Sequence, residues 1–207
     1  MQGEMHNYTV EHIEKAFFEN EIGKIEASEQ FTDETLEWDN PENLEKHREM
    51  EENPGWEWYN DNGDIVEGRI WGGCLELVEI NLQADKTLPN PENLEGKILA
   101  LETSEEMPDQ HFVDRFMMAL GERGLLENFS AIIVGRAKAR HHEEVSPEER
   151  EEFRETQKRV IKDKVDEYAP DTPIVFNLNF GHADPIVPLP IGGKARIDTA
   201  RNKISLE

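Results

Sequence analysis

The sequence predicts a domain of the α/β class (mixed α+β), because short apolar runs that favour strands alternate with longer amphipathic segments that favour helices. The alternation starts near residue 64 and closes on a segment that indicates a β-hairpin. Hydrophobic residues make up only 36% of the chain, which is low for a globular protein. Apolar blocks such as 97–101 and 131–134 nevertheless favour a folded core over disorder.

The elements after residue 64 follow one another in a regular order. Three apolar runs bounded by polar or turn residues predict buried strands, at 97–102, 131–135 and 174–178. Two stretches with helical spacing or helix-cap residues predict helices, one over 109–123 ended by Gly124 and one from Pro147 to about Tyr168 with Ser146 as its N-cap. Residues 195–206 indicate the closing hairpin.

The segments before residue 97 are less regular. Arg69-Ile70-Trp71 predicts a strand that turns at Gly72-Gly73 into a short helix or a second strand. Residues 26–53 are polar and acidic, as in a linker or a long loop. A helix capped by Thr9 is expected near the N-terminus, and its apolar side chains need a partner that the rest of the chain does not clearly supply: Val10, Ile13, Phe17 and Phe18.

The charge balance excludes two classes of partner. The chain carries 46 acidic residues against 22 basic ones, a formal net charge of −24. Such a surface repels phosphate backbones and anionic lipids, so we expect neither nucleic-acid nor membrane binding. The single cysteine, Cys74, excludes an internal disulfide and fits a reducing compartment. Because no secretion signal or membrane-length apolar stretch is present either, we expect a cytoplasmic location.

Two further kinds of site lack support in the sequence. The run from His141 to Glu144 has metal-ligand residue types, but its adjacent histidines point apart and do not match the His-Glu-x-x-His spacing. Residues 190–194 lack the spacing of a phosphate-binding loop. We therefore expect no metal and no cofactor.

Polar side chains follow two of the predicted strands and suggest acid–base chemistry. Glu102 ends one buried strand, where α/β proteins gather catalytic groups, although it could instead cap a helix or lie on the surface. His182 lies in a Gly-His-x-Asp-Pro turn after another strand, which suits an oriented general base or, equally, a structural turn histidine. Together they suggest the base and the orienting carboxylate of a catalytic triad.

The nucleophile of such a triad is harder to place. The five serines of the chain all lack the glycine-flanked turn of a nucleophilic serine: Ser28, Ser104, Ser130, Ser146 and Ser205. Cys74 could pair with a histidine, but a small buried cysteine is the commoner case. Trp56 and Trp58 form an aromatic patch that could stack on a flat ligand or fill a core or a dimer contact.

Several ordered motifs carry a resemblance to a known family. The run 67–75 with its Gly-Gly pair, Glu102 at the end of its strand, the strand 132–136, and the turn 180–185 followed by Leu189-Pro190-Ile191-Gly192 all match in order. Together they resemble the LD-carboxypeptidase family, which includes the microcin C self-immunity proteins. The Trp38-Asp39 and Trp56/Trp58 stretches are most similar to the microcin branch.

This resemblance implies a Ser–His–Glu triad in which His182 is the general base and Glu102 orients it. It implies that the serine lies in an N-terminal flavodoxin-like domain that is missing here, and that the chain forms homodimers. The implied substrates are LD-peptide bonds of murein peptides or, in the microcin branch, the amide between an aminoacyl group and a nucleotide, with Trp56 and Trp58 against the nucleotide.

The resemblance also predicts three segments. Residues 1–30 would be the remnant final helix of the nucleophile domain, 31–63 an acidic linker and aromatic loop, and 64–207 the swivelling β/β/α C-terminal domain of the LD-carboxypeptidase type. One departure is that Cys74 replaces the family asparagine. Without the serine domain we expect the chain alone to lack peptidase activity. The alternative is a binding or interaction module that kept the fold and lost catalysis.

Overall fold

The computed structural model describes residues 5–19, 21–37, 39–86, 89–140 and 145–207. Within these ranges the centre of the molecule is a sheet of eight strands in the order β1-β10-β9-β5-β6-β7-β8-β4. Its strands are β1 (Gly23–Ile25), β4 (Glu57–Tyr59), β5 (Ile65–Cys74), β6 (Lys97–Glu102), β7 (Phe129–Gly135), β8 (Ile174–Leu178), β9 (Lys194–Asp198) and β10 (Lys203–Leu206). A separate short pair joins β2 (Gln30–Phe31) to β3 (Glu51–Glu52).

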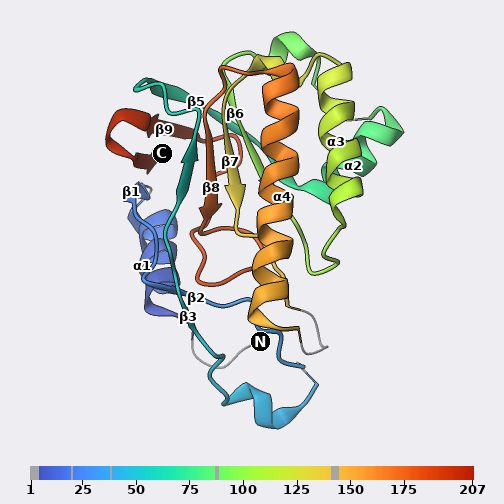
Figure 1. The fold of residues 1–207 in the computed structure, drawn as a ribbon. Coiled ribbons are helices and arrows are strands. Elements are labelled where there is room, and N and C mark those ends of the chain that lie inside the picture. The colour runs from blue at the N-terminus through green and yellow to red at the C-terminus, as the bar shows by residue number, and fades with distance from the viewer. Residues whose placement is uncertain (1–4, 20, 38, 87–88, 141–144) are drawn as a thin grey trace.

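The sheet is mixed, which confirms the predicted fold class. Strands β5 to β8 run parallel, whereas β4 and the β9, β10 and β1 side of the sheet add antiparallel neighbours. Three helices cover one face of the sheet (Figure 1): α2 (Leu75–Ala84), α3 (Gln110–Glu122) and α4 (Pro147–Tyr168). Helix α1 (Asn7–Glu14) lies on the other side and continues as a π-helical turn over Lys15–Glu19.

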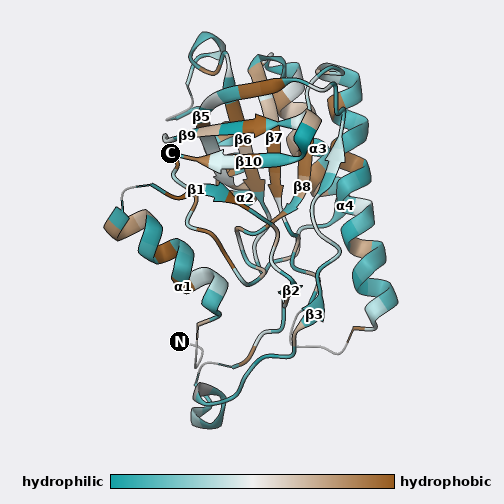
Figure 2. Cartoon of the chain, turned by 90° about the vertical axis from the view of Figure 1, so that its left-hand side faces the viewer, coloured by the Kyte–Doolittle hydropathy of each residue, from teal (hydrophilic) through white to brown (hydrophobic). Residues whose placement is uncertain are grey.

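Alternate residues of the central strands belong to two separate hydrophobic cores, one on each face of the sheet. Leu99 and Leu101 of β6 pack beneath the three helices, while Ile98 and Ala100 point to the opposite face. The apolar colour is accordingly concentrated on the central strands, and the outer side of α4 is hydrophilic (Figure 2). Strands buried on both faces lose the polar–apolar alternation, which is why the sequence shows them as continuous apolar runs.

Both long helices begin at a side-chain cap, and the one predicted for α4 is present. The Asp109 side chain accepts a hydrogen bond from Phe112 N at the start of α3. At the start of α4, Ser146 and Glu149 form a reciprocal capping box in front of Pro147. The helices in the described ranges include none that is both long and apolar enough to span a bilayer.

Two local predictions were wrong. Gly72 and Gly73 do not form a turn, because β5 continues through them to Cys74. Gly72 pairs with Ala100, and a Cβ at Gly72 would lie 2.0 Å from the Ala100 carbonyl oxygen. Glycine at this position therefore allows the two strands to approach closely. The cap of α1 is the His6 side chain, which accepts from Tyr8 N at 3.2 Å. Thr9 instead accepts a hydrogen bond from Ile186 N at 2.9 Å.

The N-terminal segments contribute to the same sheet as the rest of the chain. Strand β1, from residues 1–30, pairs with β10, and β4, from residues 31–63, pairs with β8. The stretch 26–53, expected to be a linker, contains the β2–β3 pair and the fully buried Asp33. The predicted boundaries at 30 and 63 therefore do not coincide with a break in the sheet. Of the Trp38-Asp39 stretch, Trp38 lies outside the described residues.

Replacing Gly72 by alanine tests the close approach of β5 and β6. We expect Gly72→Ala to lower the free energy of unfolding by about 3–5 kcal/mol, because the new Cβ meets backbone and φ is +132°. Gly73→Ala is the matched control, since φ there is +148° but no atom lies within 4 Å of the added Cβ. It should cost only about 1–2 kcal/mol. Urea unfolding of both variants gives the comparison, and equal costs would contradict this explanation.

Candidate active site

Glu102 is the last residue of β6 and is held in a tight space. The four residues before it are fully buried, and its own side chain is 10% exposed. A Cβ added at Gly135 would lie 3.0 Å from the Glu102 Cβ, and one added at Gly181 would lie 2.8 Å from both Cβ and Oε2. The carboxylate is therefore fixed by backbone from the segments that end β7 and follow β8.

His182 meets this carboxylate from the turn after β8. Its Nδ1 lies 2.7 Å from Glu102 Oε2, and its side chain is 38% exposed. Because an ionised carboxylate can only accept hydrogen bonds, Nδ1 carries the proton in this contact. That tautomer leaves Nε2 as the basic nitrogen of a neutral ring, as a general base requires.

A second carboxylate lies at the other ring nitrogen. Glu105 Oε2 is 3.0 Å from His182 Nε2, and the Glu105 side chain is 65% exposed. A neutral imidazole has one N–H, so both carboxylates are satisfied together only when the ring is protonated. Glu102 is enclosed and Glu105 is largely in solvent, so the two contacts differ in how easily they break.

The histidine turn is braced by the N-terminal part of the chain. Thr32 and Asp184 exchange backbone hydrogen bonds of 2.7 and 2.8 Å. Arg48 forms an ion pair with the Asp184 carboxylate at 2.5 Å. Behind the turn, Asn179 donates to Ser28 Oγ at 2.8 Å and to the Pro185 carbonyl at 3.2 Å. Residues 28–48 therefore position the imidazole, although none of them contacts it in the hydrogen bonds described.

Cys74 ends β5 and lies in register beside Glu102. Its thiol donates to Glu76 Oε2 at 3.4 Å, and the other Glu76 oxygen accepts from the Ser104 hydroxyl at 2.6 Å. Burial, together with the charges of Glu102 and Glu76, raises the pKa of the Cys74 thiol to about 11. The thiol is thus held protonated near neutral pH, which is the opposite of an activated nucleophile.

The serines have other partners. The hydroxyls of Ser28, Ser130 and Ser104 donate to the Gln30 carbonyl, the Gly96 carbonyl and Glu76 respectively. Ser146 caps α4. In the described part of the chain no hydrogen bond joins a serine to His182.

Trp56 and Trp58 are partly buried rather than freely exposed. Both pack against the core on the α1 side of the sheet. The Trp56 indole Nε1 donates to Asn179 Oδ1 at 3.3 Å, which connects it to the residues behind the histidine turn.

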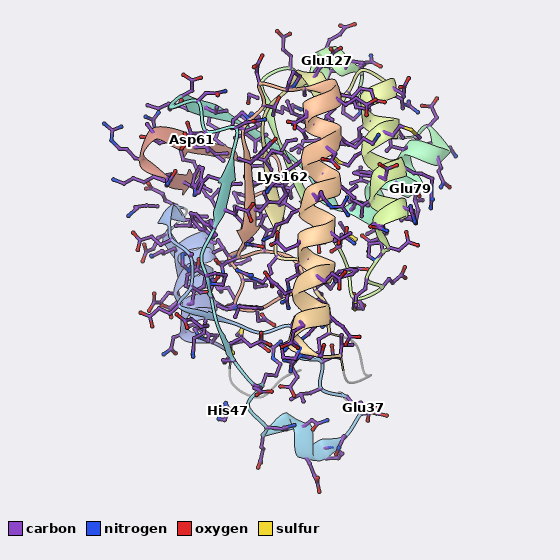
Figure 3. All side chains as sticks on the ribbon, viewed as in Figure 1. Glu37, His47, Asp61, Glu79, Glu127 and Lys162 are labelled. Atoms are coloured by element: carbon purple, nitrogen blue, oxygen red, sulfur yellow. The ribbon has the colours of Figure 1, made fainter. Side chains whose placement is uncertain are left out.

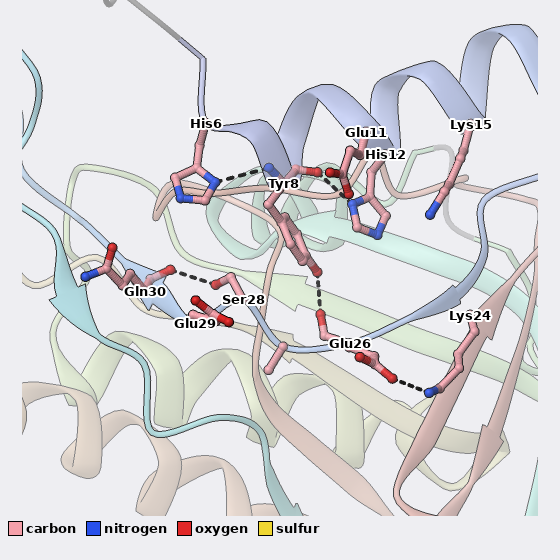
Figure 4. Close-up of a pocket in the computed structure, with 11 residues that line it drawn as sticks. His6, Tyr8, Glu11, His12, Lys15, Lys24, Glu26, Ser28, Glu29 and Gln30 are labelled. Atoms are coloured by element: carbon pink, nitrogen blue, oxygen red, sulfur yellow. Dashed lines mark hydrogen bonds and ion pairs between the residues drawn. The ribbon is translucent and has the colours of Figure 1, made fainter.

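Metal ligation finds no support over the described ranges, where no group of three or more His, Cys, Asp or Glu side chains could hold an ion. The run from His141 to Glu144 lies outside those ranges. A separate polar pocket of about 450 Å³ lies between α1 and the segment 24–30 (Figure 4). Its walls carry both signs of charge, including Lys15 and Lys24 as well as Glu11 and Glu26.

The sequence therefore predicted two residues of the candidate site and missed others. Glu102 and His182 are brought together. Glu105, Arg48 and Glu76 were missed, because their contacts depend on tertiary structure: Glu105 and Arg48 lie on loops, and Glu76 lies in the first turn of α2. Only Glu105 carried a local signal, three residues after Glu102.

Comparisons with known proteins identify the family of the chain. The sequence profile of the LD-carboxypeptidase C-terminal domain matches residues 67–197. The putative carboxypeptidase YocD of Bacillus subtilis (strain 168) is 31% identical over 147 residues, which are 68% of this chain and 40% of YocD.

Solved structures show the same fold. The MccF-like protein from Streptococcus pneumoniae, in complex with AMP, has a TM-score of 0.80 and 26% identity, over 100% of this chain and 59% of that one. The microcin C7 self-immunity protein MccF, in complex with aspartyl sulfamoyl adenosine, has a TM-score of 0.67 and 22% identity, over 89% of this chain and 49% of that one. The chain thus spans only about half the length of these structures and less of YocD. Since the family profile covers well over half of the sequence, the chain belongs to the LD-carboxypeptidase family, whose C-terminal domain it contains.

Proposed function

We propose that this chain supplies the histidine and the glutamate of a Ser–His–Glu triad to a serine carboxypeptidase or amidase. The supporting observation is the 2.7 Å contact between His182 Nδ1 and the enclosed Glu102 carboxylate at the carboxyl edge of the parallel strands. The serine would come from a nucleophile domain outside these 207 residues.

In this proposal His182 takes the proton of the serine hydroxyl at Nε2 as the serine oxygen attacks the substrate carbonyl carbon. Nε2 then gives that proton to the leaving amine as the C–N bond breaks, leaving an acyl-enzyme. Water repeats the sequence, losing a proton to Nε2 and releasing the carboxylic acid as the serine regains its proton. Glu102 stays ionised and stabilises the imidazolium, and Glu105 must leave Nε2 before the serine can approach.

The substrate class follows from the relatives. We propose LD-peptide bonds of murein peptides or the amide of an aminoacyl-nucleotide, because the matched relatives include a putative carboxypeptidase and MccF-type proteins bound to AMP and aspartyl sulfamoyl adenosine. Trp56 and Trp58 are proposed to face the nucleotide. The link from Trp56 through Asn179 to the histidine turn supports a place near the reaction centre.

Exposed apolar side chains at the end of the N-terminal helical segment support the proposal that a partner domain is missing. Phe17 and Phe18 are 70% and 82% exposed, so the helical segment leaves its apolar side chains uncovered. We propose that this helix is the last element of the nucleophile domain and that the domain boundary falls before Ile22, which is buried in the core beneath the sheet. Homodimer formation stays a prediction.

A binding or interaction module without catalysis is the alternative. Two observations favour it: Cys74 stands where the family has asparagine, and Glu105 contacts the nitrogen that a general base needs. The reading frame upstream of Met1 separates the hypotheses, since a frame encoding a glycine-flanked serine favours the enzyme.

A chimera tests the triad. The part of YocD outside the matched region, joined to this chain, should hydrolyse an LD-tetrapeptide or an aminoacyl sulfamoyl nucleotide, while this chain alone should not. Within the chimera we expect Glu102→Gln and His182→Ala each to lower kcat by on the order of 10³-fold or more, because one removes the carboxylate that orients the base and the other removes the base itself. Liquid chromatography of the product gives the rates.

Glu105→Gln is the matched control for Glu102→Gln, since both glutamates contact the same ring. It should keep at least the parent activity, because it removes only a group that competes for Nε2. A chimera that is folded by circular dichroism and whose activity survives His182→Ala would rule out the proposed triad.

Thiol titration tests whether Cys74 could replace the serine. Alkylation by iodoacetamide should rise with pH around a midpoint near 11. Since the thiolate forms only as pH rises through the pKa, the rate at pH 8 should be about a hundredfold below that of an ordinary exposed cysteine. A cysteine-containing peptide gives the reference rate. A midpoint below that of the peptide would restore Cys74 as a candidate nucleophile.

A further inference from the structure

Asn179 joins the two ends of the histidine turn. It is the first residue after β8, which ends at Leu178. Its backbone carbonyl accepts a hydrogen bond from Val187 N at 2.6 Å, and its side-chain Nδ2 donates to the Pro185 carbonyl at 3.2 Å. The chain therefore leaves the sheet at Asn179, passes through His182 and returns to contact the same residue, as in a compact loop whose ends are held close together.

The side-chain amide of Asn179 is buried and fully hydrogen-bonded. The residue is 5% exposed. Besides the Pro185 carbonyl, Nδ2 contacts Ser28 Oγ at 2.8 Å. Oδ1 accepts from Trp56 Nε1 at 3.3 Å and from Ser28 N at 3.4 Å. Because an indole N–H can only donate and a carbonyl can only accept, these partners fix which end of the amide is oxygen and which is nitrogen.

The imidazole depends on this closure because it has few contacts of its own. Among the hydrogen bonds and ion pairs of the described residues, its ring nitrogens contact Glu102 and Glu105 alone. The preceding residue, Gly181, has a φ of +96°, and glycine has wide conformational freedom. The direction of the His182 side chain therefore depends on how the two ends of the turn are held.

We propose that Asn179 is a positioning residue, which keeps His182 Nδ1 against Glu102 by holding the ends of the histidine turn together. Its role in the reaction rests on the proposed function, in which His182 is the general base. Asn179 acts through the imidazole and contacts no reacting atom. When its side chain is removed, the Pro185 end of the turn loses its donor, and a displacement of about 1 Å at the base costs on the order of 100-fold in rate.

Asn60 provides a matched control at the opposite end of β8. Its Nδ2 also donates to a proline carbonyl, that of Pro170 at 3.0 Å, and to the Thr172 carbonyl at 3.2 Å. Both acceptors precede β8, whereas Asn179 follows it. Asn60 has a φ of +54°, so alanine there also costs stability. We expect Asn60→Ala and Asn179→Ala each to lower the thermal midpoint by about 3–10 °C.

Proton NMR of the 207-residue chain provides the first measurement. An Nδ1–H held against a carboxylate gives a resonance far downfield of the amide protons, which is assigned by its disappearance in His182→Ala. In Asn179→Ala we expect this proton to exchange with water at least about tenfold faster, or its resonance to vanish, because the contact with Glu102 opens. In Asn60→Ala the resonance should be unchanged.

Kinetics of the YocD chimera provide the second measurement. We expect Asn179→Ala to lower kcat by about 100-fold and to change KM by less than about threefold, because the base is displaced while the groups that bind substrate stay. Asn60→Ala should keep the parent kcat. Asn179→Asp is the second variant, since it keeps the shape and the Oδ1 acceptor and loses only the donors of Nδ2. It should behave like Asn179→Ala in both measurements.

The outcomes separate this proposal from the triad. A folded Asn179→Ala or Asn179→Asp that keeps both the resonance and kcat overturns the positioning role. Failure of both variants to fold also overturns it, because the residue would then serve the stability of the fold. An unmodified chain without the resonance overturns this proposal together with the Glu102 contact. A chimera whose activity survives His182→Ala overturns the triad, whatever the resonance shows.

Discussion

The site depends on how little room surrounds the Glu102 side chain. Two glycines, one ending β7 and one preceding His182, leave the space that this carboxylate occupies, so that three neighbouring chain segments meet around a single acidic group. A carboxylate held in this way needs no further hydrogen-bond network to stay aimed at the imidazole. The geometry of the candidate site is therefore a consequence of backbone packing at the edge of the sheet, and the imidazole takes its orientation from the carboxylate.

The position of the histidine turn depends on residues from the N-terminal part of the chain. The residues on either side of the histidine turn are bound by side chains or backbone of Thr9, Ser28, Thr32 and Arg48. Asp33 connects the same N-terminal region to α4 through its ion pair with Arg154. A polar, acidic stretch that looks like a linker thus supports the candidate active site. Although it has no regular element of more than a few residues, it makes long-range hydrogen bonds to the histidine turn that the sheet does not supply.

The sequence was informative wherever periodicity or a cap carried the signal. Buried strands such as 97–102 and the helix from Pro147 were predicted correctly, because continuous apolar runs and a capping box are local. The Gly72-Gly73 pair was read as a turn since glycine marks both turns and close strand contacts, and only the partner strand distinguishes them. Strands β1 and β4 have three residues each, too few for any pattern. Glu102 and His182 were found from strand ends, whereas the contact of Glu105 with His182 depends on a loop path that only tertiary structure determines.

The distribution of charge between interior and surface has its own consequence. Among the described residues, more basic than acidic side chains are buried. The buried basic residues are Arg136, Lys138, Arg150, Arg154 and Lys158, and the buried acidic residues are Asp33, Glu102 and Asp198. The exterior is therefore even more acidic than the composition suggests, and carboxylates such as Glu37, Asp61 and Glu127 project at its periphery (Figure 3). An anionic molecule diffusing near this protein is repelled over most of its surface. Discrimination against large polyanions would then be a by-product of the fold.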